Sequence, residues 1–174
     1  MELRHALLGL ISLRPMSGYD LGRAFAGSVA HFWHADQSQI YRTLERLTAS
    51  GAITTRVIPQ EGRPDRKVHS LTEVGHGELE DWLTSPVEAD RPKEAFLARL
   101  FFAGPLGQEA VERLLTEREQ HVAATRDELD SVDVPGDDLA AALRAATLRY
   151  GVIQAEAELA WLRETMRAIN DLED

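Results

Sequence analysis

The sequence predicts a mainly α-helical protein that carries one small β-hairpin and is divided into two domains. Three observations predict this class. The first half has the order helix, helix, helix, hairpin, helix; the second half has helical periodicity throughout; and residues 85–92 between them hold two prolines and several charges. We therefore expect one domain over residues 1–84 and a second over residues 93–174.

The composition is that of a globular chain of 174 residues, whose 44% of hydrophobic residues are enough to form a core. The absence of cysteine excludes disulfides, thiolate metal sites and thiol nucleophiles. No apolar run is long enough to span a bilayer, and Glu2 stands where a signal peptide requires positive charge. We therefore expect a cytoplasmic protein that makes no membrane contact.

Charge is unevenly distributed along the chain, whose formal net charge is −10. Residues 1–83 hold 9 Lys and Arg against 10 Asp and Glu, whereas residues 84–174 hold 10 against 19. The segment 36–67 is locally positive. If one region of this acidic protein meets phosphate, it is this segment.

Two helices are predicted at the start of the chain. Leucines at helical spacing predict the first over Leu3–Leu13, and Arg14 and Pro15 end it. Ser17 offers a hydroxyl N-cap for a short second helix that ends near Gly27. The residues expected to face the core are Leu3, Leu7, Leu10, Ile11, Leu21 and Phe25.

A third helix is predicted to run from Asp36 to about Ser50. Asp36 and Gln39 have the spacing of a capping box, and Gly51 stands where a left-handed C-terminal cap belongs. The apolar side of this helix is formed by Ile40, Leu44 and Leu47.

A β-hairpin and a fourth helix are predicted to follow. β-Branched residues predict strands over Ile53–Ile58 and Arg66–Leu71, with turn-forming residues between them, and Thr72 caps the helix. Three helices, a hairpin and a further helix are the order of a winged helix-turn-helix. The residues of the fourth helix that we expect to face the core are Val74, Leu79, Trp82 and Leu83.

The second half is predicted to hold three helices, a short apolar one at residues 96–101, one at about 108–131 and a long one at about 138–172. The long helix has one apolar stripe, and a stripe of that length usually packs against a partner helix. In a chain this small the partner helix can come from a second copy. We therefore interpret this half as a helical dimerisation domain, with contacts from Leu143, Tyr150, Ile153 and Trp161.

The outward side of the third helix is the candidate site for reading DNA, because a helix-turn-helix places its second helix in the major groove. Gln pairs with adenine and Arg with guanine, and hydroxyl groups bind phosphate. A solvated helix face is the alternative for the same residues. The candidate residues are Gln37, Ser38, Gln39, Tyr41, Arg42, Thr43 and Arg46.

Three cations, Arg63, Arg66 and Lys67, gather in and after the hairpin turn. A basic wing of this kind can lie along the DNA backbone or enter the minor groove, and a charged, soluble turn is the alternative. A candidate helix and a candidate wing in one small domain together favour double-stranded DNA as the partner.

The first half resembles the PadR family of bacterial regulators, through residues 6–10 (ALLGL), 17–21 (SGYDL), 39–47 (QIYRTLERL), 62–64 (GRP) and 71–75 (LTEVG). The second half resembles the helical domain of the longer, virulence-activator-like branch, through residues 96–102 (FLARLFF) and 158–162 (ELAWL). The resemblance implies a homodimer that binds a palindromic operator, usually as a repressor, and that a small ligand releases in some members. His69 stands where the family commonly has Tyr, and we expect it to affect packing at the base of the hairpin.

A small-molecule effector is a further expectation. In related regulators that respond to phenolic acids, the effector lies between the two domains, and aromatic residues with a few polar groups suit an aromatic or drug-like ligand. The alternative is that Phe32 and Trp33 belong to an interdomain or dimer core. The tentative ligand residues are His31, Phe32, Trp33, His34, Phe101 and Phe102.

Other functions find little support in the sequence. His31, His34 and Asp36 are too few for a metal site, so we expect neither a metal nor a cofactor. The chain has no phosphate-binding glycine loop, nucleophile elbow or His-Glu-x-x-His helix, so we do not expect an enzyme. The alternative to a DNA-binding repressor is a winged-helix module that binds another protein through its acidic helices.

Overall fold

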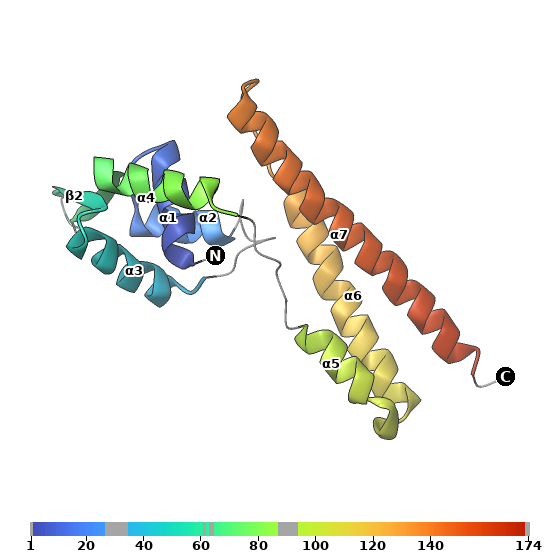
Figure 1. Ribbon diagram of the computed structural model, residues 1–174. Helices are drawn as coiled ribbons and strands as arrows, with labels where there is room; N and C mark the ends of the chain where they lie inside the picture. The colour runs from blue at the N-terminus through green and yellow to red at the C-terminus, as the bar shows by residue number, and fades with distance from the viewer. Residues whose placement is uncertain (1, 27–34, 61, 63–64, 87–93, 173–174) are drawn as a thin grey trace. The chain divides into compact units, whose positions relative to one another are not determined.

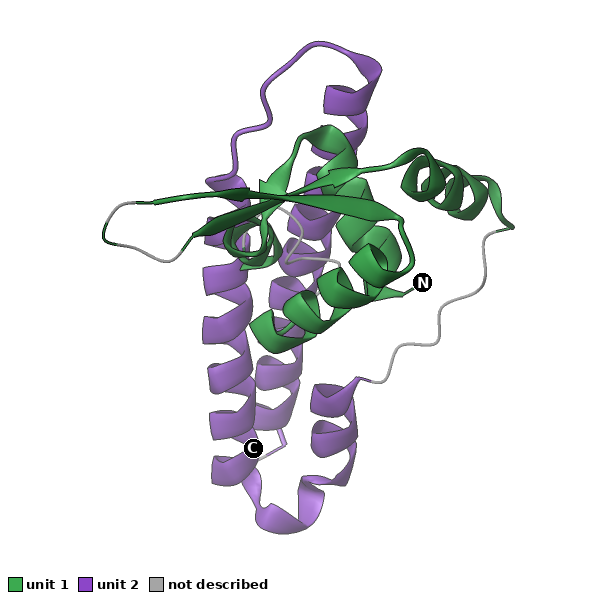
Figure 2. Cartoon of the chain, turned by 90° about the vertical axis from the view of Figure 1, so that its left-hand side faces the viewer, with its two compact units in different colours: residues 1–88 green, residues 89–174 purple. Residues whose placement is uncertain are grey.

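The chain forms two compact units, residues 1–88 and residues 89–174, which Figure 2 colours separately. The computed structural model describes residues 2–26, 35–60, 62, 65–86 and 94–172 (Figure 1). The described part is mainly helical with one small sheet, so the predicted fold class is confirmed. None of the described helices is both long enough and apolar enough to cross a membrane.

The first unit contains the predicted helices and hairpin in the predicted order, with bounds within two residues of those expected. One element was not predicted, the two-residue strand β1, because so short a strand has no periodicity to detect. The elements are α1 (Leu3–Leu13), β1 (Met16–Ser17), α2 (Gly18–Ala26), α3 (Gln37–Ala49), β2 (Ile53–Ile58), β3 (Arg66–Leu71) and α4 (Glu73–Thr84).

The three strands form one antiparallel sheet in the order β1-β3-β2. Ile53 pairs with Leu71 at the base of the hairpin and Ile58 pairs with Arg66 at its outer end. On the other edge of β3, Met16 pairs with His69 and Ser17 with Val68. The residue that caps α2 therefore lies in a strand that pairs with the second arm of the hairpin.

The core of the first unit lies among α1, α2, α3 and the base of the sheet, with Leu79 of α4 at its margin. The side chain of Trp82 covers one edge by stacking on His5, with ring centroids 5.1 Å apart. The fully buried large side chains of this unit are Leu7, Leu8, Leu21, Ile40, Leu47 and Ile53.

The expectation that Val74 and Leu83 face the core is wrong, since their exposed fractions are 60% and 66%. The buried face of α4 is centred on Gly75 and Leu79. At about 100° per residue, Leu83 lies about 60° to one side of the centre of that face and Val74 about 120° to the other. The helix is apolar over a wider arc than the rest of its unit covers.

The second unit is built on an antiparallel pair of helices, α6 (Gln108–Asp130) and α7 (Leu139–Asn170), preceded by α5 (Ala95–Phe102) and a 3-10 turn at Gly104–Leu106. Its core joins α6 to α7, and Phe96 and Leu100 of α5 pack against it. Arg118 of α6 lies over the Phe96 ring, 5.2 Å from its centroid, so α5 is fastened to α6. The buried core residues are Leu115, Val122, Ala155, Leu159 and Leu162.

The long helix α7 has two apolar faces. The face that packs within the chain is made of small and branched residues, including Gly151, Ala155 and Leu159. The predicted stripe lies on roughly the opposite side, within an arc of about 80°. Its four named residues, Leu143, Tyr150, Ile153 and Trp161, have exposed fractions from 37% to 59%. The partner that the length of α7 demands is therefore α6 on one face. Among the described residues of this unit the stripe stays largely exposed, although Trp161 packs edge to face against Phe96 of α5, with ring centroids 6.3 Å apart.

Candidate nucleic-acid interface

Helix α3 presents the candidate base-reading residues on its solvent side because its opposite side is anchored in the core by Ile40, Leu44 and Leu47. Its start is fixed by the predicted capping box, in which the Gln39 side-chain oxygen accepts a hydrogen bond from the Asp36 backbone at 3.2 Å. Six of the seven candidates are exposed and Thr43 is half-buried. The exposed ones are Gln37, Ser38, Gln39, Tyr41, Arg42 and Arg46.

Two of these side chains already have partners inside the helix. The Thr43 hydroxyl donates to the Gln39 carbonyl oxygen at 2.8 Å, and the Gln39 side chain serves the capping box. Arg42 and Arg46 form none of the ion pairs found in the described part of the chain. Among the described residues, the two arginines are thus the cations of this helix that have no ion-pair partner.

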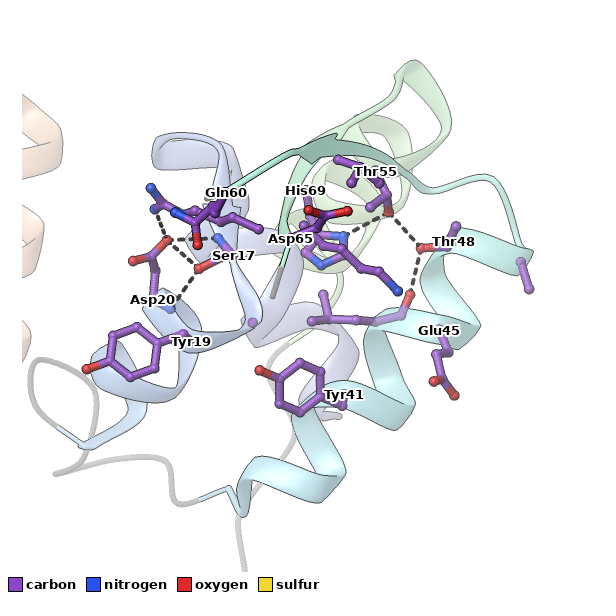
Figure 3. Close-up of a pocket in the computed structure, with 16 residues that line it drawn as sticks. Ser17, Tyr19, Asp20, Tyr41, Glu45, Thr48, Thr55, Gln60, Asp65 and His69 are labelled. Carbon is purple, nitrogen blue, oxygen red and sulfur yellow. Dashed lines mark hydrogen bonds and ion pairs between the residues drawn. The ribbon is translucent and has the colours of Figure 1, made fainter. Parts of the chain in front are cut away.

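A cavity of about 1020 Å³ lies between α3, the start of α2 and the wing (Figure 3). Tyr19 and Tyr41 stand on its α2 and α3 sides. The Tyr41 ring is 45% exposed and rests on Gly18, where an added Cβ would come within 2.5 Å of the ring. A glycine at the start of α2 therefore allows Tyr41 to pack and still keep its hydroxyl at the surface.

The wing contributes Lys67 to this cavity, and Arg66 at its edge is held in place by an ion pair. The Arg66 guanidinium donates to Asp20 Oδ2 at 2.7 Å, and Ser17 donates to the same oxygen from its backbone and its hydroxyl. Burial alone would raise the pKa of Asp20, but the hydrogen bonds from Ser17 and Arg66 and the charge of Arg66 lower it to about 2. Arg63, the third predicted wing cation, lies outside the described residues.

His69, the residue that departs from the family pattern, is buried at the base of the wing. Its Nδ1 lies 3.0 Å from the Thr55 hydroxyl, which in turn lies 3.5 Å from the Thr48 hydroxyl on α3. Burial lowers the pKa of His69, and the charge of Lys67 lowers it further. A neutral imidazole therefore links β3 to β2, and the two threonines link the sheet to α3.

The tentative ligand residues are not brought together in any described site. His31, Phe32, Trp33 and His34 lie outside the described residues. Phe101 and Phe102 lie on α5, where their rings pack edge to face with centroids 5.0 Å apart, and both are largely exposed.

Sequence reasoning missed two residues at the candidate interface, Tyr19 and Asp20. Tyr19 lies beside the cavity with an exposed fraction of 64%, which no periodicity could indicate. The spacing of Ser17 and Asp20 is a capping-box signal that was available. The pairing of Asp20 with Arg66, which is 46 residues away, has no local signature.

A buried three-helix core, an exposed third helix and a two-stranded wing beside it define a winged helix-turn-helix of the kind found in DNA-binding transcriptional regulators. Comparison with known proteins identifies the family. Residues 7–81 match the transcriptional regulator PadR-like family, and residues 92–170 match the virulence activator α C-terminal family. The chain belongs to the PadR-like family of transcriptional regulators.

Relatives and solved structures agree with this assignment. The chain is 38% identical over 92 residues to the probable transcriptional regulator Rv1176c of Mycobacterium tuberculosis and 34% identical over 120 residues to the negative transcriptional regulator PadR of Bacillus subtilis. These matches cover 53% and 68% of this chain, and 49% and 65% of the length of the two relatives.

Solved structures share the fold over nearly the whole chain. The structure of smu.1604c from Streptococcus mutans has a TM-score of 0.84 and 27% identity, covering 96% of this chain and 99% of that one. The structure of Bacillus subtilis PadR with operator DNA has a TM-score of 0.81 and 26% identity, covering 95% and 97%. Bacillus subtilis PadR has also been solved with p-coumaric acid, with a TM-score of 0.71, 26% identity and coverage of 97% and 98%.

Proposed function

We propose that this protein is a sequence-specific DNA-binding repressor rather than an enzyme or a protein-interaction module. The observation that carries the proposal is the row of exposed polar and cationic residues on α3, beside a cavity that opens toward the wing. The Bacillus subtilis relative is named as a negative regulator and has been crystallised with operator DNA, which supports the same role here.

The residue types suggest that some side chains contact the bases and others contact the DNA backbone. Arg42 and Gln37 suit hydrogen bonding to base edges in the major groove, because a guanidinium recognises guanine and an amide recognises adenine. Tyr41 and Lys67, beside the cavity, suit the sugar-phosphate backbone. In this arrangement α3 selects the sequence and the cavity between α3 and the wing receives one strand.

We further propose that the operator is palindromic and that the protein binds it as a homodimer. The largely exposed stripe on α7 supports this, since four large apolar side chains along one side of a long helix are suited to a matching helix. A two-fold dimer presents its recognition helices to half-sites one DNA turn, ~34 Å, or a multiple of it apart.

A small aromatic effector that releases the DNA is the third part of the proposal. The support is the p-coumaric acid complex of the Bacillus subtilis relative and the exposed pair Phe101 and Phe102, which offers apolar surface to a planar molecule. Thermal-shift screening with phenolic acids and drug-like aromatics tests this part, because a ligand that binds the folded state raises its melting temperature. Phe101→Ala should abolish the shift.

Salt dependence of DNA binding tests the central proposal. Fluorescence anisotropy with a labelled duplex from the region upstream of its own gene should give an affinity that falls steeply as salt rises, because bound Lys and Arg displace counterions. An unrelated duplex of equal length should bind far more weakly. A flat response, or equal binding to both duplexes, would favour the protein-interaction module.

A further inference from the structure

One carboxylate, that of Asp20, joins the start of α2 to the wing. Asp20 Oδ2 accepts hydrogen bonds from Ser17 N at 2.9 Å, from Ser17 Oγ at 2.7 Å and from Arg66 Nη2 at 2.7 Å. In return, Ser17 Oγ accepts a hydrogen bond from the Asp20 backbone at 3.2 Å. The same oxygen that caps α2 thus also holds an arginine of the hairpin, as the dashed lines of Figure 3 show.

Arg66, which pairs with Asp20, lies at the outer end of the hairpin. Arg66 is the first residue of β3 and pairs with Ile58, the last residue of β2, so it stands where the paired strands end and the turn begins. Ser17 is itself paired with β3, at Val68. The ion pair therefore fastens the outer end of the hairpin to the same helix start that the sheet already contacts further in.

Electrostatics make this carboxylate unexpected on a surface that binds DNA. It adds negative charge beside phosphate and neutralises one of the wing's cations. The Asp20 side chain is 21% exposed, so solvent and salt screen it only in part. Such a carboxylate favours DNA binding only if the order it imposes on the wing outweighs its repulsion of the phosphates.

We propose that Asp20 is a positioning residue for DNA binding: it holds Arg66, and with it the wing, in the orientation that meets the DNA backbone. The proposal rests on the proposed DNA-binding function. A guanidinium has five N–H donors, and the contact with Asp20 uses one Nη2 donor, so others remain for a phosphate. A side chain ordered in advance loses less conformational entropy when DNA binds.

The test compares Asp20→Asn with a matched control, Glu45→Gln, by anisotropy on the duplex from upstream of the protein's own gene. Glu45 lines the same cavity and forms none of the ion pairs found among the described residues. Both variants remove one negative charge. Glu45→Gln should bind the duplex slightly more tightly than the parent, whereas Asp20→Asn should bind it about tenfold more weakly. Asp20→Glu keeps a carboxylate at this position and should therefore lose less affinity than Asp20→Asn.

A double-variant cycle separates positioning from capping of α2. The amide of Asp20→Asn still accepts a hydrogen bond from Ser17, and its effect on affinity should disappear in an Arg66→Gln background. In parallel, NMR titration of the Asp20 carboxyl should give a higher pKa in Arg66→Gln than in the parent, which tests the contact even if Asp20→Asn does not fold.

The outcomes are distinct. If Asp20→Asn tightens binding as Glu45→Gln does, if its effect persists unchanged without Arg66, or if the carboxyl titrates alike in both proteins, the positioning role is overturned. If the parent protein itself binds no DNA, the proposed function fails instead.

Discussion

The carboxyl of Asp20 makes stability depend on pH in a narrow acidic range. Because folding lowers its pKa from 3.8 to about 2, the ionised form stabilises the folded state, and this contribution is complete above about pH 5 and is lost as the pH falls toward 2. Solvent exposure of the pair limits it to the order of 1 kcal/mol. Urea unfolding of the parent and Asp20→Asn should therefore differ at pH 6 and converge toward pH 2.

Convergence of the two unfolding free energies at low pH distinguishes loss of the Asp20 charge from an effect of the substitution that does not depend on charge. A difference in unfolding free energy that stayed constant between pH 6 and pH 2 would show that the lost contribution does not depend on the charge. Arg66→Gln serves as the companion variant, since it removes the guanidinium and should reduce the same pH dependence.

The two kinds of cation at the interface should give different binding signatures. Arg42→Ala should cost roughly 1–3 kcal/mol on the preferred operator and relax the preference at one base pair, because it removes the proposed base contact. Lys67→Ala should weaken all duplexes similarly and reduce the salt slope by about 1, because it removes the proposed phosphate contact.

Anisotropy over a set of single-base operator variants and three salt concentrations measures both effects. Arg113→Ala, on α6 of the other unit, is the control for simple loss of charge. If Arg42→Ala and Lys67→Ala behave like this control while staying folded, the surface assigned to DNA is wrong.

At the scale of elements, the contact of α4 with the base of the hairpin depends on a glycine. The Gly75 backbone approaches Ala52 so closely that a Cβ at residue 75 would overlap the Ala52 carbonyl oxygen. The same carbonyl accepts hydrogen bonds from the Thr72 backbone at 3.1 Å and the Thr72 hydroxyl at 3.0 Å. Backbone atoms cannot move aside as a side-chain tip can, so the junction between wing and helix has no room for a larger residue.

Gly75→Ala should therefore lower the unfolding free energy by about 2–4 kcal/mol. Gly77 of the same helix has no atom within 4 Å of an added Cβ, so Gly77→Ala should raise stability by about 0.5–1 kcal/mol through helix propensity. Urea denaturation of both variants measures this difference. Equal effects in the two variants would mean that the close approach at Gly75 is absent in solution.

The elements themselves were predictable because their signals are local. The caps at Ser17, Asp36 and Thr72 and the left-handed Gly51, with a φ of 74°, fixed helix ends to within two residues. The buried face of a helix was less predictable, because its width depends on neighbours that are distant in the sequence. Val74, for example, was expected in the core and is exposed. The ion pair of Asp20 was beyond reach for the same reason.

At the scale of the whole molecule, α7 has one apolar face for folding and one for the proposed association. The face with Gly151 and Ala155 is used within the chain, which leaves the stripe with Tyr150 and Ile153 for the proposed second copy. A charge on the stripe should therefore separate the two copies without unfolding the unit. Because an operator with two half-sites is bound by both copies at once, the separated copies should also bind it more weakly.

Ile153→Asp should convert the dimer to a monomer at micromolar concentration and weaken binding to the full operator by more than tenfold, while its circular dichroism stays that of the parent. Ala145→Asp adds the same charge to an exposed position of α7 about 120° from the stripe, and should leave the dimer intact. Sedimentation equilibrium gives the mass of each variant. A monomeric parent, or a dimer that Ile153→Asp leaves unchanged, would place the association surface elsewhere, and the spacing of operator half-sites would then no longer follow from this helix.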